Sequence, residues 1–145
     1  MNRILKGLLI VSAACLWAGC HEVTVGFLET ENARYVVDSM TVRRVLDPLK
    51  DLDKKLMETG AYWQSTAIQG VLGTAPLTYE FAGVTASEGG DSQLFEQQIV
   101  IRGGGRICLP SKDLQVPVGR YRISLRVSNP GYSAELKDVF TIIVE

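Results

Sequence analysis

The chain has 145 residues, of which 46% are hydrophobic and 21% charged, and its formal net charge is −1. This is the length of one folded domain with an ordinary globular composition. Without Arg3 and Lys6, which lie in a removable N-terminal segment, 13 of the 15 basic residues remain against 16 acidic ones. No basic surplus exists to displace counterions from a phosphate backbone, so nucleic acid is excluded as a partner.

The first 19 residues have the organisation of a signal peptide. Arg3 and Lys6 form a positive head, and an apolar stretch of 11 residues, Gly7 to Trp17, follows them. Such a stretch suits the core of a secretion signal and is too short to span a bilayer. We therefore predict a signal peptide at 1–19 and one mature domain at 20–145.

The end of this segment, Ala-Gly-Cys at 18–20, resembles a lipobox, the recognition site of the lipoprotein signal peptidase. The resemblance implies that Cys20 is lipidated and becomes the mature N-terminus, with acyl chains such as palmitate forming a durable membrane anchor. Trp17 departs from the pattern, since an aliphatic residue is usual there. Two alternatives stay open: cleavage after Ala14, which gives a soluble secreted protein, and acylation of Cys15.

Beyond Cys20 the dominant pattern is alternation of apolar and polar residues, which is typical of half-buried strands. The pattern predicts strands at 23–27, 35–45, 63–72, 77–81, 95–102, 106–109, 119–128 and 139–144. It is clearest in 119–128, which ends at the turn residues Asn129-Pro130-Gly131. In 139–144, Val139 and Ile143 lie opposite the main apolar side, so this strand is expected to be covered on both faces. We predict an all-β, two-sheet sandwich of about seven to eight strands.

Two local features interrupt the strands. Residues 47–60 form the one helical candidate, because Asp47 can cap, Pro48 suits the first helical position and Gly60 can terminate. A loop leading into the strand at 63 is the alternative. The leucines expected on one face of this helix are Leu49, Leu52 and Leu56. The triple glycine 103–105 lies between two predicted strands and indicates a hairpin turn, not a phosphate-binding loop.

Two segments carry a family resemblance. Residues 119–131, GRYRISLRVSNPG, resemble the closing strands of immunoglobulin-like and PKD-like modules, although the aromatic-Asp-Phe-Gly-Asp-Gly motif of PKD repeats is absent. The lipobox followed by 63–76, WQSTAIQGVLGTAP, resembles the layout of small lipoproteins of Bacteroidetes. The resemblance implies an immunoglobulin-like sandwich held at the outer membrane, often near glycan-handling machinery. A fold of this kind does not by itself fix a function.

The residues needed for catalysis are missing. The only histidine is His21, next to the anchor, so no Ser-His or Cys-His nucleophile pair is possible in the domain. Cys108 lies between two aliphatic residues and is expected to be a small buried apolar side chain. Zinc would need several Cys or His ligands. We predict a protein that is not an enzyme and binds no metal or cofactor.

Acidic residues give only weak alternatives. Asp47, Asp51 and Asp53 have no calcium-loop spacing and fit a helix cap and a solvated face better. Glu88 and Asp91 flank two glycines in a polar loop, where the alternative is a paired-carboxylate glycosidase site.

Two groups of residues are candidates for ligand binding. Tyr62 and Trp63 could stack on sugar rings, and the alternative is core packing, because immunoglobulin-like domains often bury one Trp. A basic stripe on one strand face could meet an acidic glycan or partner, or could pair with neighbouring carboxylates such as Glu135 or Asp138. The residues of this stripe are Arg120, Arg122 and Arg126.

The sequence also contains one candidate site for covalent modification. Asp38-Ser39-Met40 resembles the short motif at which Bacteroidetes O-glycosylate exported proteins, which makes Ser39 a candidate site.

A strand beginning about three residues after Cys20 would hold the domain within about 10 Å of the bilayer. We therefore expect a non-catalytic envelope lipoprotein whose sandwich binds other envelope proteins. The alternative is a surface glycan-binding accessory protein of a polysaccharide-utilisation system.

Overall fold

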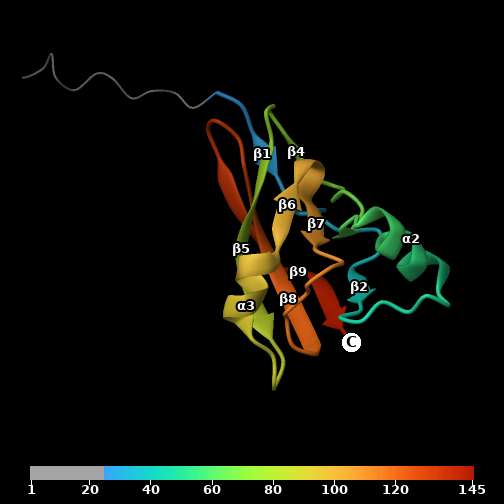
Figure 1. Cartoon of the computed structure of the whole chain (residues 1–145). Coiled ribbons are helices and arrows are strands. Elements are labelled where there is room, and N and C mark those ends of the chain that lie inside the picture. Colours follow the sequence, from blue (N-terminus) through green and yellow to red (C-terminus); the bar gives the residue numbers. More distant parts are fainter. Residues whose placement is uncertain (1–24) are drawn as a thin grey trace, which may run out of the picture.

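The computed structural model describes residues 25–145, so the expected signal peptide, Cys20 and His21 lie outside the described residues. Within this part of the chain, strands form three open sheets and only two short α-helices occur (Figure 1). The expectation of a mostly β domain is confirmed at this level.

The largest sheet has four strands in the order β2-β9-β8-β5. These are β2 (Ser39–Val42), β5 (Thr78–Ala86), β8 (Gly119–Ser128) and β9 (Ser133–Val144). β2 runs parallel to β9, and the other neighbours are antiparallel. β8 and β9 form a hairpin, and their long ladder makes this pair the centre of the sheet.

The strand with the clearest alternation is the strand that the sequence predicts best. β8 covers the predicted range, and its four apolar side chains are fully buried while its arginines are exposed. The buried side chains are Tyr121, Ile123, Leu125 and Val127. In β9 the expected buried side is also confirmed, but Val139 and Ile143 are only half-buried, so cover on its second face is partial.

A second sheet has the order β3-β7-β6, with β3 (Trp63–Gln64), β6 (Val100–Arg102) and β7 (Arg106–Leu109), all antiparallel. The triple glycine forms one 3-10 turn, Gly103–Gly105, between β6 and β7, as the sequence predicts. Side chains from the four-stranded and three-stranded sheets join one hydrophobic core, with Ile107 and Leu109 on one side and the β8 side chains on the other. Burial of this shared apolar surface is the main term that stabilises the fold.

A third, two-stranded sheet pairs β1 (Leu28–Glu29) with β4 (Leu72–Gly73). Here two predicted strands prove wrong. The one at 23–27 does not form in its described part, because Val25 and Phe27 are exposed and pairing begins at Leu28. The first paired residue therefore lies eight residues after Cys20, and an extended chain of that length spans up to about 28 Å, more than the expected distance of about 10 Å.

The predicted strand at 63–72 is also wrong as one element. It breaks into β3, an isolated bridge between Arg34 and Gln69, and β4. Gly70 accounts for the interruption between the bridge and β4: its φ of +76° is left-handed, and a Cβ there would lie 2.0 Å from the carbonyl oxygen of Asn32. A strand cannot continue through that conformation.

The first half of the predicted strand at 95–102 is a helix. α3 spans Ser92–Gln98, and only β6 remains of the strand. The Asp91 side chain accepts the Leu94 N–H at 3.0 Å and caps the helix. Phe95 packs from this helix against Tyr121, with ring centroids 4.7 Å apart.

The helix expected at 47–60 is confirmed as α2 (Asp51–Thr59), with a later start. The Asp47 side chain does not cap it; it accepts the Leu49 N–H within a turn that precedes the helix. Gly60 ends it with a φ of 65°. Of the three leucines expected on one face, Leu52 and Leu56 lie on α2 and line the same groove, whereas Leu49 precedes the helix and is exposed.

The predicted strand at 35–45 is shorter than expected, because only Ser39–Val42 pair with β9. Met40 and Val42 lie in phase as predicted, with Val42 fully buried.

Candidate interaction surfaces

The two aromatic candidates face different environments. The Trp63 side chain is only 4% exposed and belongs to the core, as one of the two alternatives predicted, whereas Tyr62 is 39% exposed. The guanidinium of Arg102 lies 4.8 Å from the Tyr62 ring centroid, a cation–π contact that covers one face of the ring. The two rings therefore do not form a single exposed platform.

A groove of about 360 Å³ borders both aromatic residues. Its walls come from β2, α2 and β3, with Leu52 and Leu56 on the helix side and Met40 opposite. The indole Nε1 of Trp63 is buried without a hydrogen-bond partner. The groove is apolar and partly enclosed, and Tyr62 is the aromatic side chain that a ligand there could reach.

The three arginines lie exposed along the outer face of β8, beside acidic residues. Arg122 is 3.7 Å from Asp138, and Arg126 stands in register between Glu80 of β5 and Glu135 of β9. Because these groups are exposed, such pairs contribute little to stability. Among the described residues the predicted pairing is thus present for Asp138, whereas Glu135 only stands opposite Arg126 in the ladder and Arg120 stands opposite Ile143.

Ser39 is half-buried at the start of β2, beside a small groove of about 170 Å³. Asp38 before it is exposed, and its carbonyl accepts the Thr141 N–H of β9 at 2.9 Å. The backbone of the candidate glycosylation motif is therefore part of the sheet ladder.

The acidic candidates have structural roles. Asp53 is fully buried, bound to Nη1 of Arg43 at 2.6 Å and to the Asp47 N–H at 2.9 Å, and Asp91 caps α3. Among residues 25–145 no group of three or more His, Cys, Asp or Glu side chains could hold a metal ion.

Cys108 is fully buried in β7, as expected from its aliphatic neighbours. Burial raises the pKa of its thiol above the ordinary value, while the nearby guanidinium groups of Arg102 and Arg106 act in the opposite direction. Because the thiolate is the reactive form, burial and the raised pKa both disfavour reaction of this thiol.

One exposed apolar surface is not indicated by the sequence patterns. Two grooves of about 480 and 490 Å³ share Arg44 and Val45; the first also contains Val118, and the second contains Met57. We call Val45, Met57 and Val118 the end patch, because they lie at the end of the domain where the chain terminates. Val45 is 84% exposed and Val118 59%.

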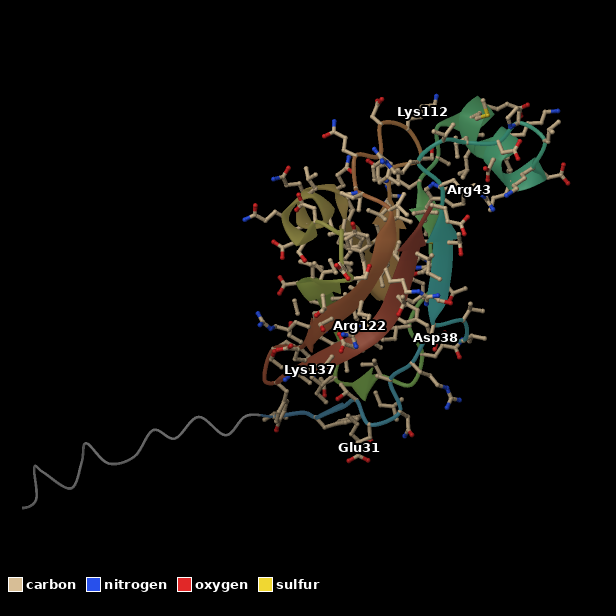
Figure 2. All side chains as sticks on the ribbon, turned by 90° about the horizontal axis from the view of Figure 1, so that it is seen from below. Glu31, Asp38, Arg43, Lys112, Arg122 and Lys137 are labelled. Carbon is tan, nitrogen blue, oxygen red and sulfur yellow. The ribbon has the colours of Figure 1, made fainter. Side chains whose placement is uncertain are left out.

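Cationic and anionic groups surround the end patch. Arg44 and Glu145 border the first groove, and Lys112 and Asp113 border the second. Figure 2 shows Lys112 and Arg43 at this end, far from Glu31 and Lys137 at the other. The only sequence signal for the patch is local: Val118 stands between Pro117 and a glycine, where a turn and not a buried strand is expected.

Comparison of the chain with protein-family models, with curated proteins and with solved structures finds no match. In the part of the chain that the structure covers, neither helix has the length and apolar character needed to cross a membrane.

Proposed function

We propose that this chain is a non-catalytic envelope lipoprotein. In this proposal residues 1–19 are a signal peptide, acylated Cys20 anchors the mature protein in the outer membrane, and an immunoglobulin-like sandwich binds another envelope protein. The sequence supports the anchor through its positive head, short apolar stretch and Ala-Gly-Cys ending.

The strand order supports the immunoglobulin-like assignment. The neighbours β5-β8-β9 correspond to strands C, F and G of that fold, and β3-β7-β6 correspond to B, E and D. Tyr121 adds a second argument. It lies at the start of β8, and its hydroxyl donates to the Pro117 carbonyl at 2.8 Å. This is the position and bond of the tyrosine corner in immunoglobulin-like domains.

The end patch is the observation that carries the interaction role. Exposed apolar side chains that line adjoining grooves are a feature of protein-binding surfaces, and charged groups around them form a polar rim. Val45 and Val118 come from two segments distant in sequence and meet at one groove. A protein partner that buries this surface is the function these contacts support best.

Photocrosslinking in living cells tests this proposal. A photoreactive amino acid at Val118 should give a discrete adduct with one envelope protein, and Val45→Asp in the same chain should abolish it. The same probe at Thr85, exposed on β5, is the matched control. No adduct at Val118, or an adduct that survives Val45→Asp, would contradict the interaction role.

Glycan binding is a second candidate, supported by the groove beside exposed Tyr62. An aromatic face and an apolar wall can receive a sugar ring. A glycan array with Tyr62→Ala tests it, because this substitution leaves the core intact whereas Trp63→Ala would open a cavity. Absent binding, or binding unchanged by Tyr62→Ala, would eliminate this candidate.

A further inference from the structure

A second set of exposed apolar side chains lies at the opposite end from the end patch, where the described chain begins. We call it the entry-end group. Its members are 41–87% exposed: Val25, Phe27, Leu72 and Tyr132. In Figure 1 the start of the coloured chain, the β1–β4 sheet and the β8–β9 turn gather at this end, and the C-terminus lies at the other.

Backbone contacts hold the entry-end group together. The Phe27 carbonyl accepts the Thr74 N–H at 3.0 Å and the Asn129 side-chain amide at 2.8 Å. The Asn129 N–H in turn donates to the Tyr132 carbonyl at 2.9 Å, and Leu72 pairs with Glu29 in the β1–β4 ladder. Three segments distant in sequence therefore hold Phe27, Leu72 and Tyr132 at one surface, and Val25 lies two residues before Phe27.

The length of chain before this surface indicates what covers it. Cys20 precedes Phe27 by seven residues, so an anchor at Cys20 lies at most about 25 Å away along the extended chain. A tether this short keeps the entry end at a high effective concentration beside the bilayer. The lipid surface is thus the apolar phase nearest to these residues.

We propose that the entry-end group is a second membrane contact, in which its side chains insert into the interfacial region of the bilayer that holds the anchor. This inference rests on the proposed acylation of Cys20. Phe27 and Tyr132 supply aromatic rings, the residue type favoured at membrane interfaces. Figure 2 shows Lys137 as well as Glu31 at this end, and Glu29 lies opposite Leu72, so the nearby charges are mixed and give no net attraction to anionic lipid. The contact therefore depends on apolar burial and is insensitive to salt.

This contact sets the orientation of the domain. β8 runs from Gly119, next to the end patch, to Ser128, next to the β8–β9 turn of the entry end. Ten residues of strand span about 33 Å. With the entry end on lipid, the end patch is held roughly that far above the membrane and faces away from it, where a protein partner can reach it.

Quenching of tryptophan fluorescence by brominated lipid tests the inference. The processed, full-length mature protein is reconstituted in phosphatidylcholine vesicles with brominated acyl chains, carrying Phe27→Trp or Tyr132→Trp. Val118→Trp at the far end is the matched control, and wild type gives the background of buried Trp63. All three replaced side chains are at least 41% exposed, so the fold should tolerate the substitutions.

We expect brominated lipid to reduce the added tryptophan emission at positions 27 and 132 by more than about half, because interfacial residues lie within about 10 Å of the acyl boundary. This quenching should not depend on salt. The added emission at position 118 should remain unquenched. Equal quenching at all three positions, or none at 27 and 132, overturns the inference. The intact mass of the same samples separates the two proposals. An acylated protein without quenching at the entry end leaves the lipoprotein standing, whereas an unacylated protein removes both.

Discussion

Tyr121→Phe tests the corner that joins the two sheets, and its effect can be worked out from the contacts of one hydroxyl. That hydroxyl donates to the Pro117 carbonyl at 2.8 Å and accepts the Asp91 N–H at 3.2 Å. Phenylalanine keeps the buried ring and its stacking on Phe95 but removes both bonds. At about 1 kcal/mol net for each hydrogen bond, we expect the free energy of unfolding to fall by about 2 kcal/mol.

Equilibrium unfolding in urea measures this change. With a slope of about 2 kcal/mol per molar urea, the midpoint should fall by about 1 M. Tyr62→Phe is the control, because its ring is exposed and its hydroxyl makes no hydrogen bond within residues 25–145, so a shift below about 0.5 kcal/mol is expected. Equal midpoints for the two variants would refute the role assigned to the Tyr121 hydroxyl.

Three further predictions concern buried polar groups. Asp53→Ala should lower the free energy of unfolding, measured in urea, by about 3 kcal/mol, because it leaves the half-buried Arg43 without its partner. The control Asp51→Ala, on the exposed side of α2, should lower it by less than about 0.5 kcal/mol. Cys108 should resist iodoacetamide at pH 8 in the folded protein and react after unfolding, because burial raises the pKa of its thiol; equal rates would show that it is accessible. Burial, with a smaller contribution from the neighbouring Tyr79, raises the pKa of the Tyr35 hydroxyl. The neutral Tyr35 side chain therefore stabilises the fold fully below about pH 10, and this stabilisation is lost as the pH rises further. Tyr35→Phe should reduce the loss of unfolding free energy at alkaline pH, and an unchanged pH profile would contradict this.

An element could be predicted from the sequence where its own apolar pattern determines its structure. β8 could be predicted because every second side chain enters the core between the two sheets, so burial has the same period as the strand. α3 was missed because Phe95 and Ile99 were interpreted as strand residues, although their spacing of four also fits one helix face. The cap at Asp91, four residues before Phe95, was the signal that could have decided between them.

Among the candidate sites, burial that depends on neighbouring residues could be predicted, and exposure that depends on distant segments could not. Burial of Cys108 followed from its immediate neighbours, and Trp63 was left open because its exposure depends on packing against distant segments. The end patch could not be predicted, because Val45 and Val118 become neighbours only through the β2–β9–β8 arrangement. Alternation also placed Val45 within a strand, whereas the ladder ends at Val42 and leaves it exposed.

The mass of the mature N-terminal peptide, isolated from native membranes, tests the membrane anchor most directly. We predict a chain that begins at Cys20 and carries the added mass of a diacylglyceryl group and a further acyl chain, with this species lost in Cys20→Ala. A native chain that begins at Cys15 without lipid, or one whose Cys20 thiol is free, would contradict the account.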